Sequence, residues 1–439
     1  MSTCLFLRMT THNVIVKFKY SITTCSAEEM VQIDENIAPV HDFGQKLRQK
    51  ALITHLKTLV EWGRDLKNKK GVITAPSLPV ISINLDLTTG CDHACGHCVD
   101  DLVINSGKKL AFEEVKQSID TLHKQGLRSV ILIGGGEPTL YPQFGEVVAY
   151  LKERKIQVGI VSNGGHGEKI IAIADLLQKG DWVRFSIDAA TNDTYQQIHW
   201  KQSLRKPTHT LEKVWAYASE ITKKNPTIEM GYSYVIVWDG LEYHGRKLLD
   251  NIDEIPSAAK KAREHGFTYL SLKPCLIKYE EEGETLFYHT KKEYMDQVIE
   301  RIKKSIVQAK ENAGRVKIME SQNLVALLSN QLERLRHQPK ICYAGFLKQV
   351  INPSGIFHCP AFRGDDRAKV GPSGGYVTTD ACANTGDAVL KNLLKFNATT
   401  TCSNIACFYN GVNRYIHNLI ESDTDLDNLK ITDGEDFFF

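Results

Sequence analysis

Short apolar, β-branched segments alternate with amphipathic segments of helical length from residue 81 onward, and this alternation limits the possible folds most. We expect six strands, over 81–87, 129–133, 156–161, 182–187, 229–236 and 268–272. The expected helices cover 111–124, 143–154, 169–178, 211–223 and 258–265. Such alternation is typical of βαβ units and a parallel sheet. The sheet should curve towards a barrel or wind both ways from a switch point, with its working surface at the carboxyl ends of the strands.

The other segments differ in character, so we expect five regions. An N-terminal extension, residues 1–80, should hold a helix near 42–69, and the barrel should occupy 81–290. A helical linker over 291–339 begins with a long charged helix. Residues 340–415 are rich in Gly, Cys and Asn, and indicate a small second domain. Residues 416–439 form an acidic tail, which we expect to be a solvated extension.

Composition excludes several classes of protein. In 439 residues, 54 Lys and Arg against 52 Asp and Glu leave a net charge of +2, so a basic nucleic-acid binder is not expected. No apolar run is long enough for a membrane helix, and we see no secretory signal. The cysteines number 11, an odd count, so they cannot all pair internally. We therefore expect a reduced, cytoplasmic protein whose thiols bind metal or do chemistry.

Three cysteines lie within eight residues after the first expected strand: Cys91, Cys95 and Cys98. Thiolates this close can converge on one ion or cluster, and soft sulfur ligands favour zinc, Cu(I) and iron–sulfur centres. Unrelated buried thiols are one alternative. A zinc site completed by His93 or His97 is a second. The third is an iron–sulfur cluster with three protein thiolates and one open iron.

A glycine-rich segment, Gly134-Gly135-Gly136-Glu137-Pro138, follows the second expected strand. The glycines permit close backbone approach, and the spacing matches neither a dinucleotide-binding fingerprint nor a P-loop. Its backbone groups and single carboxylate suit a small molecule that carries an ammonium group.

Together, the CxxxCxxC loop, the Gly-Gly-Glu-Pro segment and the six βα units resemble the radical S-adenosylmethionine (radical SAM) superfamily over about residues 81–275. The resemblance implies a [4Fe–4S] cluster on Cys91, Cys95 and Cys98, whose open iron is chelated by SAM. It also implies that the methionine amino group lies at Gly135, Gly136 and Glu137. His97 stands where the family usually has an aromatic residue, and we expect its ring near the adenine.

Polar residues at later strand ends match the family's contacts to the methionine carboxylate and the ribose of SAM. They are Ser162, Asn163, Ser186 and Asp188, although Ser, Asn and Asp also form ordinary turns. The implied reaction is a one-electron cleavage of SAM to a 5′-deoxyadenosyl radical, which abstracts hydrogen from an unactivated carbon. The resemblance also implies an electron donor such as flavodoxin or ferredoxin.

A second set of cysteines follows, with Cys342 and Cys359 on either side of a hairpin signal, Asn352-Pro353-Ser354-Gly355. The segment resembles the auxiliary-cluster domain, of SPASM or twitch type, that follows many radical SAM barrels. That resemblance implies one auxiliary [4Fe–4S] cluster on Cys342, Cys359, Cys402 and Cys407. Cys382 is a possible substitute ligand, and a zinc ribbon remains an alternative.

We therefore expect a partial (β/α)6 TIM-like barrel with an N-terminal helical extension and a small C-terminal cysteine-rich domain. The expected function is hydrogen abstraction from a small polar or sugar-like substrate. The alternatives are maturation of a ribosomally made peptide, a zinc-binding interaction protein and an iron–sulfur electron carrier. Cys275, after the sixth expected strand, is a candidate catalytic thiol or a buried structural one.

Overall fold

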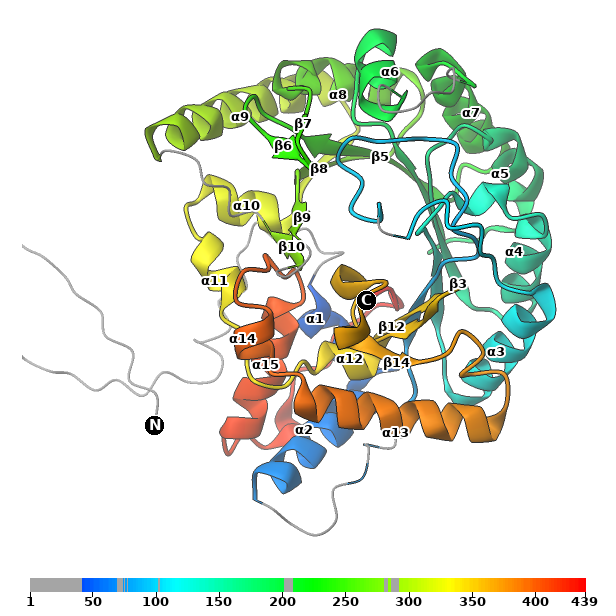
Figure 1. Ribbon diagram of the computed structural model, residues 1–439, viewed down its shortest axis with the longest axis vertical. Coiled ribbons are helices and arrows are strands. Elements are labelled where there is room, and N and C mark those ends of the chain that lie inside the picture. The colour runs from blue at the N-terminus through cyan, green and yellow to red at the C-terminus, as the bar shows by residue number, and fades with distance from the viewer. Residues whose placement is uncertain are drawn as a thin grey trace, which may run out of the picture.

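A computed structural model describes residues 42–68, 74, 76, 78–101, 103–200, 208–279, 283–285 and 292–439. Its centre is a ten-stranded sheet in the order β11-β8-β5-β4-β3-β2-β1-β12-β13-β14. The sheet curves strongly, and an arc of helices covers its outer face (Figure 1). This arrangement confirms the expected barrel-like α/β fold. Cys4 and Cys25, in the N-terminal extension, lie outside the described residues.

The six expected strands are all present. They are β1 (Ser82–Leu85), β2 (Ser129–Leu132), β3 (Gln157–Ser162), β4 (Trp182–Ser186), β5 (Glu229–Ile236) and β8 (Tyr269–Pro274). Neighbouring strands in this series pair in parallel. Their carboxyl ends therefore meet on one side of the sheet, as βαβ connections require.

The helices of the outer arc follow the expected pattern. They are α3 (Phe112–Gln125), α4 (Phe144–Glu153), α5 (Gly167–Ile173), α6 (Asn192–Trp200), α7 (Leu211–Lys224), α8 (Ile255–Glu264) and α9 (Lys292–Ala313). Local signals set some of their ends. Thr210 caps α7 by accepting a hydrogen bond from the Lys213 amide, and two lysines in the last turn complement the helix dipole.

Two further parallel strands extend the six-stranded series. β11 (Lys317–Glu320) pairs with β8, and β12 (Lys348–Asn352) pairs with β1. β12 turns through the expected hairpin into β13 (Gly355–Phe357), which pairs with β14 (Lys369–Gly371). The cysteine-rich region therefore continues the barrel sheet and contributes a strand beside β1.

The remaining elements are short or lie at the ends of the barrel. Two small hairpins, β6 (Glu242–Tyr243) with β7 (Arg246–Lys247) and β9 (Ile277–Tyr279) with β10 (Gly283–Thr285), follow β5 and β8. The linker continues into α10 (Gln322–Leu328) and α11 (Leu332–Arg336). The C-terminal region holds α12 (Ala344–Leu347), α13 (Thr379–Lys395), α14 (Ala398–Thr401) and α15 (Asn410–Glu421).

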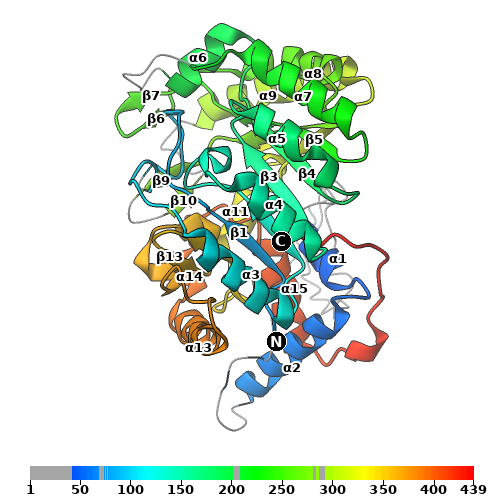
Figure 2. The ribbon, with the colours of Figure 1, turned by 90° about the vertical axis from the view of Figure 1, so that its right-hand side faces the viewer.

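The N-terminal extension contains two helices where we expected one. α1 (Phe43–Leu47) and α2 (Ile53–Lys67) are separated by a turn at Gln49, which forms a backbone bridge to Thr432. The Gln49 side chain also donates a hydrogen bond to the carbonyl of Asp436, at 2.9 Å. The contact with the C-terminal tail therefore accounts for the break. Figure 2 shows α1, α2 and the red tail together at one end of the molecule.

The expectation of a solvated tail is wrong. Phe438 and Phe439 are 7% and 3% exposed, and Phe438 packs edge-on against Trp182 at the amino end of β4. Lys46, itself buried, donates to the carbonyl of Phe438 at 2.6 Å and pairs with Asp436 at 3.0 Å. Apolar burial of the phenylalanines and ion pairs to lysines of the N-terminal helices thus hold the tail over the amino end of the barrel.

In the part of the chain that the structure describes, every helix is too short or too polar to cross a membrane.

Candidate active site

A cavity of about 1210 Å³ occupies the inside of the barrel. Its lining includes the three cysteines of the first loop, expected SAM-contacting residues at the ends of β2, β3 and β4, and all four cysteines of the second set. Gly135 is the one expected SAM-contacting residue outside this lining. The two cysteine sets that the sequence separates by more than 200 residues therefore open onto one space.

The first cysteine loop follows β1 and packs directly on the glycine-rich segment after β2. A Cβ atom at Gly136 would lie 2.5 Å from the carbonyl oxygen of Thr88 and 2.6 Å from that of Gly90. The Glu137 amide donates to the Gly90 carbonyl at 2.8 Å. On the far side of the loop, Asn105 accepts from the Cys91 amide at 2.8 Å. Glycine at position 136 is thus required for the loop to reach its place.

Burial controls the protonation of the three thiols. Burial raises the pKa of Cys98 to about 12, and the nearby Asp100 carboxylate acts in the same direction. Burial likewise raises the pKa values of Cys91 and Cys95, and for Cys95 the nearby thiols of Cys91 and Cys98 add to the effect. The metal-free loop therefore carries thiols, and a metal centre that binds there must displace their protons.

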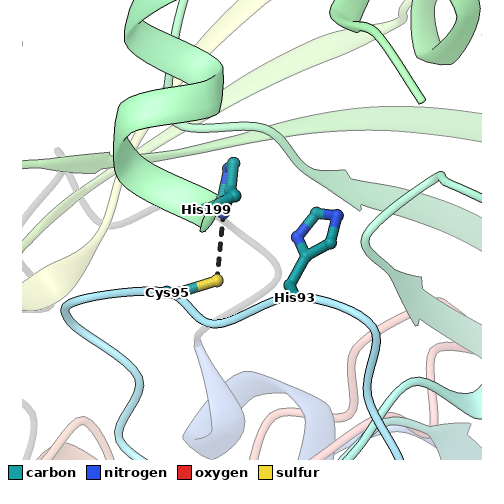
Figure 3. Close-up of side chains that lie close together, drawn as sticks. All are labelled: His93, Cys95 and His199. Atoms are coloured by element: carbon teal, nitrogen blue, oxygen red, sulfur yellow. Dashed lines mark hydrogen bonds between the residues drawn. The ribbon is translucent and has the colours of Figure 1, made fainter. Parts of the chain in front are cut away.

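A buried histidine contacts the middle cysteine. His199, at the end of α6, has its Nδ1 3.0 Å from the Sγ of Cys95, and its Nε2 lies 2.9 Å from the carbonyl oxygen of Ile187 (Figure 3). His93 lies beside both and is 3% exposed. We did not anticipate His199, because no local motif marks it and 104 residues separate it from Cys95.

Glu137 organises the ends of β2 and β3. Its Oε1 accepts hydrogen bonds from the hydroxyls of Thr139 at 2.5 Å and Ser162 at 2.8 Å, and its Oε2 accepts from the Asn163 amide at 2.7 Å. Burial raises its pKa, although these hydrogen bonds act in the opposite direction. The Asn163 side chain donates in turn to Asp92, in the cysteine loop, at 2.7 Å. Three of the expected site residues thus form one network with the loop.

His97 and Asp188 are also brought together. The His97 Nε2 lies 3.2 Å from the Asp188 Oδ2, and the Asp188 Oδ1 accepts from the Val235 amide at 2.7 Å. Burial opposes ionisation of Asp188, but the hydrogen bond and charge of His97 outweigh it and lower the pKa of Asp188. Asp188 has a φ of 59°, which turns the chain sharply after β4 and directs the carboxylate towards the loop.

The second cysteine set converges from four segments. Cys342 precedes α12, Cys359 follows β13, Cys402 ends α14 and Cys407 precedes α15. Burial raises the pKa of Cys402, and the other three thiols lie close enough to raise it further. A turn links the last two cysteines, through hydrogen bonds from the Ile405 amide to Cys402 and from the Cys407 amide to Ile405. The four expected ligands are therefore neighbours in space.

Residues 85–231 match the Radical SAM superfamily. This stretch contains the cysteine loop, the glycine-rich segment and the ends of β3 and β4 described above. These residues form a radical SAM domain. The match confirms the expectation of such a domain within the barrel.

Curated relatives match parts of this chain. A probable GTP 3′,8-cyclase of Thermococcus kodakarensis is 26% identical over 168 residues, which are 38% of this chain and 53% of the relative. The mycofactocin maturase MftC of Mycolicibacterium smegmatis is 28% identical over 136 residues, 30% of this chain and 34% of the relative. The chain thus spans about half of the first relative and a third of the second.

Among solved structures, Streptococcus suis SuiB bound to its precursor peptide SuiA has a similar fold. The TM-score is 0.50 at 15% sequence identity, and the match covers 70% of this chain and 65% of that one. At this identity, the likeness concerns the fold. It extends well beyond residues 85–231, so the radical SAM barrel and part of the flanking regions share an architecture with SuiB.

Two cysteines of the chain do not take the places that we considered for them. Cys382 lies on α13 and donates to the Gln125 side chain at 3.1 Å, away from the thiols that surround Cys402. Cys275 is 1% exposed and packs in the hydrophobic core, whereas its neighbours Pro274 and Leu276 line the cavity. A substitute-ligand role for Cys382 and a catalytic role for Cys275 are therefore not supported, because both side chains face other groups.

Proposed function

We propose that this enzyme cleaves SAM reductively and uses the resulting radical to abstract hydrogen from a carbon of its substrate. In this proposal, Cys91, Cys95 and Cys98 hold a [4Fe–4S] cluster at the carboxyl ends of the barrel strands. When bound, the cluster supplies one electron to SAM, which yields methionine and a 5′-deoxyadenosyl radical that takes a hydrogen atom from the substrate. The observation that carries the proposal is the three-cysteine loop locked against Gly136 and opening onto the barrel cavity.

The spacing of the thiols favours a cluster over a single zinc ion. Ligands of one tetrahedral zinc ion lie about 3.8 Å apart when each Zn–S bond is about 2.3 Å. Among the described residues, the groups whose ligand atoms all lie within 4.8 Å of one another are His93–Cys95–His199 and Asp92–His93–His209. Neither complete cysteine set is that compact. The wider separation suits a centre that places several irons between the sulfurs.

SAM would occupy the cavity beside this loop. Gly136 and Glu137 are proposed to receive its methionine amino group, with Gly135 supporting them from outside the cavity lining, and Ser162 and Asn163 its carboxylate end. Ser186 and Asp188 would bind the ribose, with His97 near the adenine. The hydrogen-bond network through Glu137 supports these roles, because it fixes the β2 and β3 ends relative to the cysteine loop before any ligand binds. Preorganised polar groups of this kind reduce the ordering cost of binding.

The second cysteine set is proposed to hold an auxiliary [4Fe–4S] cluster on Cys342, Cys359, Cys402 and Cys407. Three observations support this role. The four thiols are neighbours, they are not packed as closely as zinc would require, and they line the same cavity as the first set. An auxiliary centre there could exchange an electron with a substrate held between the two sites, and flavodoxin or ferredoxin is the proposed external donor.

For the substrate, we favour a small polar molecule. The relatives named as GTP 3′,8-cyclases support this choice, and the cavity of about 1210 Å³ leaves room for a small ligand beside SAM. The relative named as a mycofactocin maturase supports a peptide as the second candidate.

The proposal is tested by anaerobic reconstitution followed by reduction with dithionite in the presence of SAM. The wild type should bind iron and sulfide and form 5′-deoxyadenosine. The single variants Cys91→Ala, Cys95→Ala and Cys98→Ala should lose this product. Cys382→Ala is the matched control, because that thiol lies outside both sets and should leave the product yield unchanged. Bound zinc in place of iron, or no 5′-deoxyadenosine from the wild type, would contradict the proposal.

A further inference from the structure

Three serines form a row across adjacent strands inside the barrel. Ser186 of β4 pairs in register with Ser233 of β5, which pairs in register with Ser271 of β8. All three line the cavity. Ser233 and Ser271 are each 4% exposed, and within the described residues neither hydroxyl forms a hydrogen bond. Because both residues line the cavity and neither hydroxyl is used by a protein partner, both hydroxyls are available to a ligand there.

Two basic side chains flank this row. Lys273 of β8 pairs in register with Val235, two positions beyond Ser233 and towards the carboxyl end of the barrel. Arg184 of β4 lies two positions before Ser186, deeper in the cavity, with its guanidinium 5.4 Å from the ring of Trp182. Both line the cavity. The hydroxyl row therefore lies between two cations that come from different strands.

No carboxylate neutralises these cations within the described residues. Neither Lys273 nor Arg184 forms an ion pair or a side-chain hydrogen bond there, and the Arg184 Nε is buried without a partner. Burial lowers the pKa of Lys273 to about 7, and the Arg184 charge lowers it further, whereas Asp188 acts against both. Asp188 is itself engaged by His97 and the Val235 amide. Leaving cations unpaired in a cavity costs folding free energy unless a ligand supplies the counter-charge.

We propose that Lys273, Arg184, Ser233 and Ser271 form a subsite for an anionic group of the substrate, a phosphate or a carboxylate. This inference rests on the proposed function and specifies its substrate class. The hydroxyls donate hydrogen bonds to the anion, and the two cations balance its charge from either side. Ser186, at the end of the row, is the residue shared with the proposed SAM site. The anion thus anchors the substrate while its reacting carbon faces SAM.

The test uses the full chain and measures reductive methylation of individual lysines by mass spectrometry. Inorganic phosphate and succinate are the probes, in separate arms, with potassium chloride at equal ionic strength as the reference. A saturating anion should slow methylation of Lys273 by about tenfold, the effect expected of a charge-assisted contact. Lys261, an exposed lysine that pairs with Glu264, is the control residue and should not respond.

Variants test the residues of the subsite. The protection of Lys273 should fall below about twofold in Ser233→Ala/Ser271→Ala and in Arg184→Met, because each removes donors or charge. Arg184→Lys keeps the positive charge and should retain part of the protection of Lys273. This variant distinguishes a loss of charge from misfolding of Arg184→Met. Protection by phosphate alone indicates a phosphorylated substrate, and protection by succinate alone indicates a carboxylate.

Three results would overturn the subsite. The first is equal protection of Lys273 by chloride, and the second is protection by phosphate or succinate that survives in Ser233→Ala/Ser271→Ala. The third is protection of Lys273 by SAM that added phosphate does not displace. The last would assign these cations to the SAM carboxylate. Failure of the proposed function is a separate result. If wild-type protein forms no 5′-deoxyadenosine but phosphate still protects Lys273, an anion site exists in a protein that does not cleave SAM.

Discussion

The guanidinium of Arg363 lies 2.7 Å from the carboxylate of Asp86, measured from Nε to Oδ2. Asp86 follows β1 and is fully buried, and Arg363 comes from the segment between β13 and β14. A second oxygen partner, the Oδ1 of Asp100, lies 2.6 Å from the Arg363 Nη1. Because Asp100 is two residues beyond Cys98, this one arginine joins the C-terminal cysteine region to the first cysteine loop.

Replacing Arg363 should weaken the protein strongly. Arg363→Met leaves Asp86 buried without its cation, and breaking a buried pair in this way costs about 3–5 kcal/mol of unfolding free energy. Urea unfolding monitored by circular dichroism measures the change. Arg301→Met is the matched control, since Arg301 pairs with Asp250 and Asp253 at the surface and should cost about 1 kcal/mol or less. Equal losses in the two variants would contradict the assigned role of Arg363.

The Asp86 carboxyl should make the unfolding free energy depend on pH. Burial raises its pKa to about 6, although Arg363 and Asn352 act in the opposite direction. Since this pKa exceeds the unfolded value of about 3.9, the contribution of Asp86 to stability is fully present below about pH 4 and is lost as the pH rises towards 6. Asp86→Asn should therefore flatten the pH dependence of the unfolding free energy between these values. An unchanged slope in urea titrations across this range would count against the raised pKa.

Gly136→Ala should disable the first cysteine loop. Its new Cβ would meet two backbone carbonyl oxygens at 2.5 and 2.6 Å, so the loop must move away from β2. We expect less iron per chain after reconstitution, together with a lower unfolding free energy. Gly386→Ala is the control. Apart from its own helix backbone and chain neighbours, nothing lies within 4 Å of its added Cβ, and a helical Gly-to-Ala change should stabilise α13 by about 0.5–1 kcal/mol. Full iron loading of Gly136→Ala would refute the packing argument.

Phe438→Ala tests the tail. Truncating this buried ring, which packs on Trp182, should lower the unfolding free energy by about 3–5 kcal/mol, as for other buried phenylalanines. Ile431→Ala changes an exposed residue of the same tail, 55% accessible, and should have little effect. If the tail were solvated, both substitutions would be neutral in the same urea experiment.

The sequence predicted the parts of the fold that local patterns specify. Short apolar, β-branched runs marked all six central strands, even though β4, β5 and β8 also carry polar side chains that line the cavity. The hairpin between β12 and β13 followed from Asn-Pro-Ser-Gly. The pairing of β12 with β1 could not be predicted, because parallel partners far apart in sequence leave no local signature. The burial of the phenylalanine tail also depends on distant groups, such as Lys46 and Trp182.

The candidate site also contains some residues that local motifs predict and others that only the folded structure brings together. The three-cysteine loop and Glu137 were visible as short motifs, and the structure brings them together. His199 and Arg363 were not visible, because each acts through one contact across the fold. The serine row was equally hidden, since it depends on the register of three strands. Residues that come together only through strand register can be found only in the three-dimensional structure.

The proposed function requires one iron of the first cluster that no protein side chain occupies and that SAM binds. The most direct measurement is electron–nuclear double resonance of the reduced, reconstituted protein with SAM carrying ¹⁵N in its methionine amino group. We expect a ¹⁵N hyperfine coupling to the cluster in the wild type, and no such coupling in the Cys95→Ala variant. A reduced cluster that shows no ¹⁵N coupling with saturating SAM would contradict the proposed function.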